Sequence, residues 1–473
     1  MDPAEPAPAH AALQRAIEAH GRDAVAYQGL EPGLAAWFDD GADGGDDGDG
    51  GGGGGGDRAV AYADTGGAWV AAGGPHAPLA QRAAVAARFV DAARAAGRRA
   101  SFFAVDDQAP WPGFARVLLG EQPAFVPAGW PDTLRAHRKL REQLRRARAK
   151  GLRVRRVAPA EVAPGTALRA QLDVLTRGWL ASRHMAPMGF VVTLAPFEHA
   201  DAHRYFVAER DGRAVAYLSL VPVPARGGWL FEDQVRGPDA PNGTSESLID
   251  AAMRDLAADG AGFATTGLVP LGGAVPGWMR AVGRLGRALY DFDGLRRFKQ
   301  RLHPPAWEPV WLCYPEGEPA AAHVVDALRA FAGGSLLGFG ARTVVGHPGA
   351  LAWVLGVPLV PWTVALAAAT VTGHAGLFGF GAGALAGWTI YDGLLAVGLL
   401  RASVRPRPRL LGLLAGAATL DAALSTIHLL SVGVGVGAAA VVRTLATAAP
   451  LAGAVGLWWA RHRALATQAA QAA

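Results

Sequence analysis

The residues most suited to chemistry begin with a strongly basic stretch between Arg135 and Arg156. It holds eleven lysines and arginines and a single acid, Glu142. Because each cation can replace a counterion condensed on phosphate, a helix this basic suits an RNA backbone or an anionic lipid surface. A merely solvated helix is the alternative, and the near absence of acids argues against it. The candidate binding cations are Arg138, Lys139, Arg141, Arg145 and Arg148.

A second group follows the aromatic segment that starts at Trp229. Asp233 and Arg236 are three residues apart, so on a regular strand they point to opposite faces, unless the strand bulges or ends between them. At a strand end, both side chains could border one cleft. Asn242 then opens an Asn-Gly-Thr-Ser turn into a helix, whose free N–H groups suit an anion or a carbonyl oxygen. An ordinary surface ion pair explains the spacing equally well.

Aromatic and basic residues are interleaved in a third group, between Leu289 and Arg301, and Glu308 follows shortly after it. This mixture suits nucleotide stacking or a polar substrate pocket. Ordinary packing of Phe298 and Trp307 is the alternative for some of these side chains.

Several kinds of chemistry lack their signatures in this sequence. It contains no P-loop, no hydrolase triad pattern, no metal-binding motif and no glycine-rich pyrophosphate loop in front of a helix. The single cysteine, Cys313, excludes a disulfide within the chain and a thiolate metal cluster. We therefore expect neither a cofactor nor a metal.

The elements that must position these residues alternate between helix and strand. After a helical pattern at 13–20, strands are expected at 24–27 and 59–62. Between them, Glu31 to Asp57 carries eight acids and a pure glycine run, which indicates a flexible insertion. Further strands are predicted at 68–72, 100–105, 115–119, 205–209, 214–221, 228–236 and 263–268, and helices at 78–96, 131–150, 164–180 and 245–256. This alternation restarts once and predicts two similar α/β halves around a sheet-rich core.

From Gly349 onwards the sequence is strongly apolar. Four stretches each exceed the ~20 residues needed to cross ~30 Å of hydrocarbon, at 349–371, 375–400, 410–432 and 433–460. Arginines lie in the connection at 401–409 and in the tail, but not in the other two connections. With an even number of spans, the positive-inside tendency places these arginines and the preceding region in the cytoplasm. We therefore expect a multi-pass protein of the inner cell membrane, and a water-soluble helical bundle is the less favoured alternative.

Three ionisable residues lie inside these apolar stretches: Asp392, Asp421 and Arg443. Asp421 and Arg443 are equally far from a turn near Val432, so an antiparallel hairpin would place them at the same depth. Because an isolated charge is costly at that depth, we expect these two residues to form an ion pair. A role in transport is the alternative.

These segments, in this order, resemble the C-terminal catalytic domain of phosphatidylglycerol lysyltransferases (multiple peptide resistance factors). The resemblance runs from Leu13 to Pro315, and its segments are Leu140–Gly151, Phe231–Gly243, Leu289–Lys299 and Trp307–Pro309. It implies two tandem GNAT-like halves, which is an acetyltransferase-type fold. It also implies transfer of an aminoacyl group from aminoacyl-tRNA to a hydroxyl of phosphatidylglycerol.

The resemblance also implies roles for individual residues. The family's D-x-x-R segment falls on Asp233 and Arg236 and its late lysine on Lys299, so these are the expected catalytic residues. Asp233 could hold the α-amino group or deprotonate the lipid hydroxyl, while Arg236 and Lys299 could bind phosphate or developing negative charge. Asn242 and Glu308 join the cations of the basic helix as expected substrate-binding residues.

The expected organisation is an α/β region of tandem GNAT-like halves followed by an all-α, four-helix transmembrane domain. Its parts are a disordered N-terminus (1–10), a first half (11–163) with a Gly/Asp-rich insertion (41–57), a second half (164–318), a linker (319–348), the membrane domain (349–463) and a cytoplasmic tail (464–473). In the lysyltransferases the membrane helices precede the catalytic domain, whereas here they follow it. This order leaves open whether lipid flipping is retained. Because four spans are few for a dedicated flippase, we expect the helices to anchor the enzyme.

Two other functions fit these observations. One is a GNAT-type acyltransferase with another donor or acceptor, and the other is a non-catalytic lipid- or RNA-binding membrane protein with the same fold. The sequence leaves open which amino acid is transferred, because details of the binding pocket decide such selectivity. It also leaves the oligomeric state open.

Overall fold

The computed structural model describes residues 8–40, 58–107, 109–182, 188–280, 292–346, 348–373, 381–435 and 437–472. The predicted insertion at 41–57, residues 1–7 and residues 289–291 of the third motif lie outside these ranges. Two units emerge: an α/β unit (Met1–Leu180 with Pro187–Leu336) and a helical unit (Leu337–Ala473 with Ala181–Ala186).

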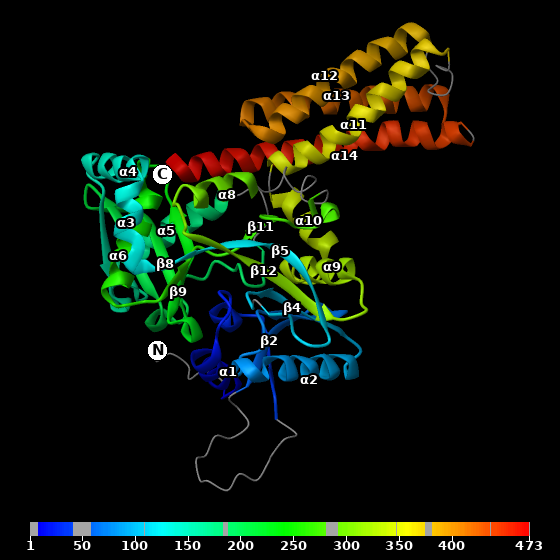
Figure 1. Cartoon of the computed structure of the whole chain (residues 1–473). Coiled ribbons are helices and arrows are strands. Elements are labelled where there is room, and N and C mark those ends of the chain that lie inside the picture. The colour runs from blue at the N-terminus through cyan, green and yellow to red at the C-terminus, as the bar shows by residue number, and fades with distance from the viewer. Residues whose placement is uncertain are drawn as a thin grey trace. The chain divides into compact units, whose positions relative to one another are not determined.

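Twelve strands form one mixed sheet in the described part of the α/β unit (Figure 1). The strand order is β1-β2-β3-β4-β12-β5-β10-β9-β8-β7-β6, and β11 pairs with β5. The strands are β1 Ala35–Phe38, β2 Ala59–Asp64, β3 Ala68–Ala72, β4 Arg99–Val105, β5 Phe114–Phe125, β6 Arg153–Val157, β7 Arg204–Arg210, β8 Arg213–Val223, β9 Gly228–Arg236, β10 Phe263–Thr265, β11 Val269–Pro270 and β12 Ala306–Pro315.

The same arrangement of strands and helix occurs twice in this sheet. In each copy an antiparallel pair, β2–β3 or β8–β9, is followed by a helix and then by a strand parallel to its second member, β4 or β10. The connecting helices are α2 (Arg82–Ala95) and α6 (Thr244–Ala258). Strands β5 and β12 lie between the two copies and pair with each other. The predicted α/β fold class is therefore confirmed.

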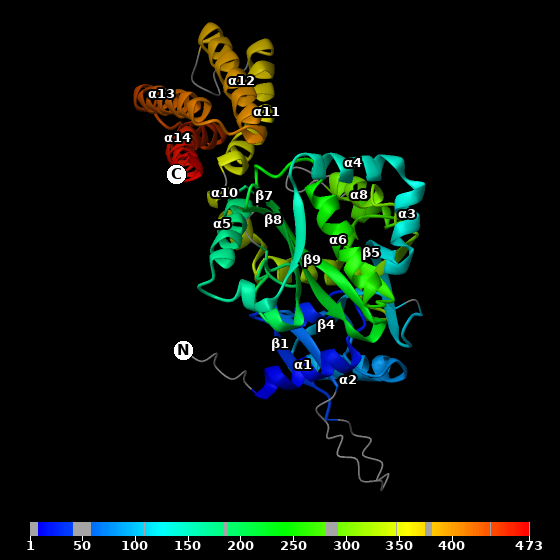
Figure 2. The same cartoon turned by 90° about the vertical axis from the view of Figure 1, so that its left-hand side faces the viewer.

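Helices cover both faces of β8 and β9 (Figure 2). On one face, side chains such as Leu218 and Phe231 pack against α6 and α4. On the other face, Tyr217 and Val235 pack against α5. Alternation of strand side chains thus assigns neighbouring residues of β9 to different surroundings. The remaining helices of this unit are α1 Pro8–His20, α3 Trp130–Ala136, α4 Arg138–Ala149, α5 Ala167–Ala181, α8 Phe292–Gln300 and α9 Ala320–Phe331.

The helix predicted at 131–150 is two helices, α3 and α4, which are separated at His137. The backbone of His137 leaves the helical region, with φ −111° and ψ 89°. Arg141 donates hydrogen bonds to the carbonyl oxygens of Leu134 and Arg135, which are orphaned at the end of α3. A side chain therefore satisfies carbonyls that a continuous helix would have used.

The prediction of a strand at 24–27 is also wrong, because the first strand begins later in the chain, at Ala35. The chain makes a 3₁₀ turn at Tyr27–Leu30, and β1 follows at Ala35–Phe38, paired with β2. Glu31 is therefore an ordered residue at the end of that turn and not part of a flexible insertion. A short apolar strand, Ala-Ala-Trp-Phe, precedes the run of acids and glycines, and the predicted flexible insertion wrongly included it.

Among its described residues, the helical unit contains four helices that could each span a membrane, as predicted. The candidate spans are Pro348–Val371, Gly383–Val404, Pro408–Val432 and Ala440–Leu465. They belong to α11 Pro348–Val371, α12 Ala382–Val404, α13 Pro408–Val432 and α14 Ala438–Ala472, preceded by α10 Leu336–Gly346. A core of leucines and alanines, among them Leu399 and Leu411, holds these helices together.

The expected ion pair between Asp421 and Arg443 is absent from the described residues. Asp421 accepts a 3.2 Å hydrogen bond from Ser425, and Arg443 donates one of 3.0 Å to the carbonyl oxygen of Gly433. Asp421 lies eleven residues before the end of α13, whereas Arg443 lies only five residues after the start of α14. The turn is longer than predicted, so the two residues differ in depth by roughly 9 Å at ~1.5 Å per residue.

Candidate functional site

Asp233 lies at a β-bulge in β9. It and Glu232 together face a single residue of β8, Ser219. The backbone N–H of Asp233 donates a 3.2 Å hydrogen bond to Ser219 Oγ. Bulges re-aim side chains and are frequent next to active sites. This one lies within the D-x-x-R motif, at its first residue.

Three carboxylates gather around the bulge: Glu31, Glu232 and Asp233, which we call the acidic site. Glu31 Oε2 accepts a 3.4 Å hydrogen bond from the backbone N–H of Thr193. Burial, together with the negative charges of Glu232 and Glu31, raises the pKa of Asp233 well above its ordinary value. Burial also raises the pKa of Glu31 to about 7, and the charges of Glu232 and Glu198 act in the same direction.

One histidine, His203, contacts the acidic site. Its Nε2 lies 3.3 Å from Oε2 of Glu232, and its Nδ1 lies 2.9 Å from the carbonyl oxygen of His199. Because a carbonyl only accepts, Nδ1 must carry a proton, and Nε2 can donate to Glu232 only when the ring is an imidazolium. Within the described ranges, neither Asp233 nor Glu31 has a cationic side chain within 4.0 Å. The acidic site can therefore accept a positively charged group such as an amine.

Arg236 lies on the other face of β9. Its Nη2 donates a 2.7 Å hydrogen bond to the carbonyl oxygen of Ala240. It borders a cleft of about 610 Å³ between α4, the start of α6 and the end of α8, which we call the basic cleft. The lining residues are Lys139, Glu142, Gln143, Arg146, Lys150, Arg236, Asn242, Gly243, Ser245, Glu246, Phe298 and Arg301. Cations outnumber acids among them, which suits phosphate groups.

Gly243 allows α6 to begin close to α4. Its φ is +94°, and a Cβ at this position would lie 2.9 Å from the carbonyl oxygen of Gln143 and 3.1 Å from Cβ of Ala147. Gln143 Nε2 also donates a 2.8 Å hydrogen bond to Glu246. This approach brings the free N–H groups at the start of α6 and the cations of α4 to one cleft.

Of the five cations predicted on α4, Lys139 alone lines the basic cleft. Arg138 pairs with Glu142 at 3.0 Å, and Arg148 reaches the buried Asp250 at 3.1 Å. Arg141 caps α3, as described above, and Arg145 is exposed. The other predicted cations are therefore committed to protein contacts or face away from the cleft.

Lys299 is buried and lines neither site. Its Nζ donates hydrogen bonds of 2.6, 2.8 and 3.2 Å to the carbonyl oxygens of Thr266, Gly267 and Leu268. Burial lowers the pKa of Lys299 to about 7. Three carbonyl acceptors match the three N–H groups of an ammonium, so the contact joins α8 to the segment after β10. The expected catalytic role of Lys299 stays a prediction.

Glu308 is engaged within the protein as well. Arg226 donates hydrogen bonds of 2.7 and 2.8 Å to its two oxygens, and Gln122 donates one of 3.2 Å. Burial raises the pKa of Glu308, but the hydrogen bonds and charge of Arg226 outweigh this and leave it below its ordinary value. Arg226 also bonds to Asp106 at 3.0 Å. Glu308 therefore belongs to an internal ion-pair network, separate from both sites.

The structure thus brings Lys139, Arg236 and Asn242 together and separates them from Asp233. Sequence reasoning missed Glu31, which is distant in the chain and lay in a segment interpreted as flexible. It also missed Arg146 and Lys150. Their signal was present, since positions 139, 143, 146 and 150 recur on one helical face. The sequence did not show which face of α4 would pack against α6.

Comparison with known proteins assigns the chain to a family. The fold and the site define the class as an α/β protein with a twice-repeated arrangement of strands and helix and a basic cleft. The sequence model described as "Phosphatidylglycerol lysyltransferase, C-terminal" matches residues 53–314, which is more than half of the chain. The chain therefore belongs to the phosphatidylglycerol lysyltransferase C-terminal family, and the resemblance is confirmed. Membership indicates a transferase.

Solved structures agree in fold. The C-terminal domain of a protein described as a lysylphosphatidylglycerol synthetase, from Agrobacterium fabrum, covers 69% of this chain and 99% of its own, with 23% identity and a TM-score of 0.55. L-PGS from Bacillus licheniformis covers 70% and 99%, with 18% identity and a TM-score of 0.57. No curated protein sequence matches.

Proposed function

We propose that this chain is a membrane-bound aminoacyltransferase that moves an aminoacyl group from aminoacyl-tRNA to phosphatidylglycerol. The observation that carries the proposal is the pairing of the acidic site and the basic cleft on the two faces of β9. An aminoacyl-tRNA offers both matching charges, since its phosphates are negative and its α-amino group is positive. Family membership supports phosphatidylglycerol as the acceptor.

The donor ester is already activated, so the protein must mainly position two substrates and stabilise an oxyanion. Asp233 and its neighbours would hold the ammonium of the aminoacyl group, or Asp233 would take the proton from the attacking lipid hydroxyl. Burial and the neighbouring carboxylates raise the pKa of Asp233, which makes it a stronger base than an ordinary aspartate. The basic cleft would bind phosphates of the donor. These residues need no metal or organic cofactor for transfer.

The four apolar helices would keep the enzyme at the membrane that contains its lipid acceptor. We propose that the α/β unit is cytoplasmic, where aminoacyl-tRNA is present. Arg401, Arg405, Arg407, Arg409 and the arginines after Ala460 support this orientation through the positive-inside tendency.

Lipid mass spectrometry tests the reaction. The chain would be expressed in a bacterial host that lacks aminoacylated phosphatidylglycerol, with the empty vector as control. We expect a new phosphatidylglycerol species, heavier by one amino-acid residue, and the mass increment names the amino acid. Good expression without such a lipid would argue against phosphatidylglycerol as acceptor.

A second assay tests the donor. Membranes that contain the protein would receive tRNA charged with a labelled amino acid, with and without ribonuclease. We expect label in the lipid fraction that ribonuclease abolishes and that free amino acid with ATP does not restore. Transfer that survives ribonuclease would point to another activated donor.

A further inference from the structure

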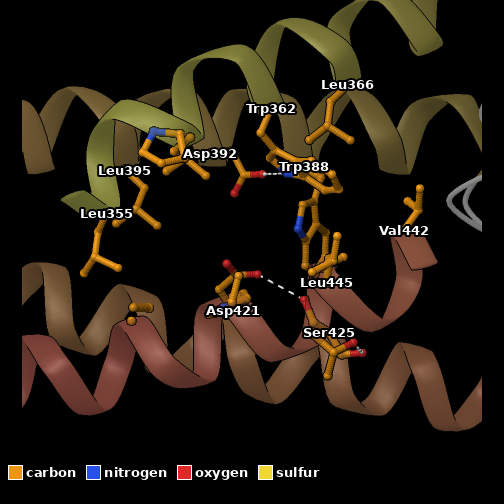
Figure 3. A pocket seen from close by; sticks show the side chains of 18 of the residues that line it. Leu355, Trp362, Leu366, Trp388, Asp392, Leu395, Asp421, Ser425, Val442 and Leu445 are labelled. Atoms are coloured by element: carbon orange, nitrogen blue, oxygen red, sulfur yellow. Dashed lines mark hydrogen bonds between the residues drawn. The ribbon is translucent and has the colours of Figure 1, made fainter. Parts of the chain in front are cut away.

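The helical unit contains a cavity of about 370 Å³ that is lined by all four long helices (Figure 3). This volume falls within the range of ~300–1,000 Å³ that is usual for small-molecule sites. Most of the lining is apolar and includes leucines and prolines of α11 and α14. The transfer reaction proposed above does not use this cavity.

Two carboxylates face each other across the cavity, Asp392 from α12 and Asp421 from α13 (Figure 3). Both are buried, with exposed fractions of 2% and 5%. Asp392 Oδ2 accepts a 3.1 Å hydrogen bond from Trp362 Nε1, and Asp421 Oδ1 accepts one of 3.2 Å from Ser425. Within the described helices, Oδ1 of Asp392 has no hydrogen-bond donor, although the side chain points into the cavity.

No cationic side chain of the described residues lies within 4.0 Å of either carboxylate. Arg443 lines the same cavity, but its Nη1 donates to the carbonyl oxygen of Gly433, and its Nε is buried without a partner. His428 also lines the cavity. Uncompensated carboxylates inside apolar helices are costly and mark ligand or ion sites in membrane proteins.

The chemistry of the lining selects among cations. Calcium and magnesium take six or more oxygen ligands, and the described residues contain no cluster of His, Cys, Asp or Glu suited to a metal. The aromatic rings of Trp362 and Trp388 border the carboxylates instead. Trp362 donates a hydrogen bond to Asp392 and Trp388 donates one to Asp421. Indole rings beside carboxylates favour an organic ammonium, and leucine side chains favour an alkyl group attached to it.

We propose that the helical unit binds one hydrophobic amine, with its ammonium between Asp392 and Asp421 and its alkyl part among the leucines of the cavity. A free alkylamine and a membrane lipid with a primary amine share this chemistry. The site is independent of the transfer reaction, and each can fail without the other.

Isothermal titration of the full chain in a neutral detergent tests the proposal. The probes are octylammonium and octanol, which have the same chain and differ in charge. We expect one octylammonium per chain, bound at least ~10-fold more tightly than octanol, which corresponds to ~1.4 kcal/mol. Equal binding of the two probes would overturn the proposal without the need for any variant.

Variants locate the ammonium. Asp392→Asn and Asp421→Asn keep the shape of the side chain, and each should weaken octylammonium by at least ~10-fold. The matched control is Thr389→Val on the same helix as Asp392, since the hydroxyl of Thr389 bonds to the carbonyl oxygen of Leu385 and does not line the cavity. Unchanged affinity in both Asn variants would show that the carboxylates hold no amine.

A competition assay then separates the two sources. Short-chain phosphatidylethanolamine should displace octylammonium if the ligand is a lipid amine, with phosphatidylglycerol of the same chain length as control. If neither lipid displaces it, the ligand is a free amine. Displacement by both lipids to the same extent would show that the cavity does not select an ammonium and would overturn the proposal.

Discussion

The two faces of β9 carry opposite charges only three residues apart. Toward α5, Asp233 joins Glu232 and Glu31 at a bulge, and burial among like charges raises the pKa of Asp233. Toward α6, Arg236 borders an open cleft rich in arginine and lysine. The D-x-x-R spacing is therefore not a pair of neighbours around one reacting atom. The two residues belong to two sites on opposite faces of the sheet. A substrate that binds at both sites must carry a positive and a negative group.

The largest effect is expected on the acidic face. Asp233→Asn in the purified full chain should lower kcat by at least ~10²-fold, as loss of a general base or of an ammonium ligand would. The measurement is transfer of labelled aminoacyl groups to lipid at saturating donor. Asp239→Asn, an exposed acid in the turn after β9, is the control and should retain activity. Full activity of Asp233→Asn would remove the acidic site from the mechanism.

Substitutions in the basic cleft should change KM for aminoacyl-tRNA. Lys139→Glu with Arg146→Glu should raise KM for aminoacyl-tRNA by ~10-fold or more and reduce its dependence on salt concentration, because fewer counterions are released. Arg145→Glu with Arg138→Glu is the matched control, since both residues lie on α4 outside the cleft. Equal effects of the two pairs would mean that the general charge of α4, and not the cleft, attracts the donor.

Lys299 sharpens the comparison because it supports the basic face from within. Lys299→Met leaves three partly buried carbonyl oxygens without this donor, at a cost of ~1–3 kcal/mol. We expect Tm to fall by several degrees, with kcat of the folded fraction nearly unchanged. Gln300→Met, the exposed next residue, should leave Tm unchanged. A normal Tm with lost kcat would instead support the catalytic role that the family resemblance implies.

The smallest effect concerns pH. Because the pKa of Glu31 is about 7 in the folded chain and 4.5 ordinarily, the folded state binds this proton more tightly than the unfolded state. The resulting stabilisation is complete below pH 4.5 and is lost as pH rises through 7. Glu31→Gln should therefore gain Tm relative to the parent at pH 8 but not at pH 4.5. Exposed Glu316→Gln is the control, and a difference independent of pH would contradict the assignment.

Local patterns predicted much of the fold. Short apolar runs located β7, β8 and β9, with Asp211-Gly212 separating the first two, and the Asn-Gly turn located the start of α6. The basic run predicted α4, and four long apolar stretches predicted α11 to α14. Each of these signals lies within one element, where side-chain period and backbone preference act directly. The break at His137 escaped because its cause, the Arg141 cap, is a contact between two elements.

The sequence by itself determined the fold class, the family, the four apolar helices and the residue types available for chemistry. Only the tertiary structure decided which of these residues meet. It placed Glu31 beside Asp233, turned Arg236 to the other face, buried Lys299 under three carbonyls and set Asp392 opposite Asp421. The physical reason is that these contacts join segments far apart in the chain, so they depend on strand register and helix packing, which no local period encodes.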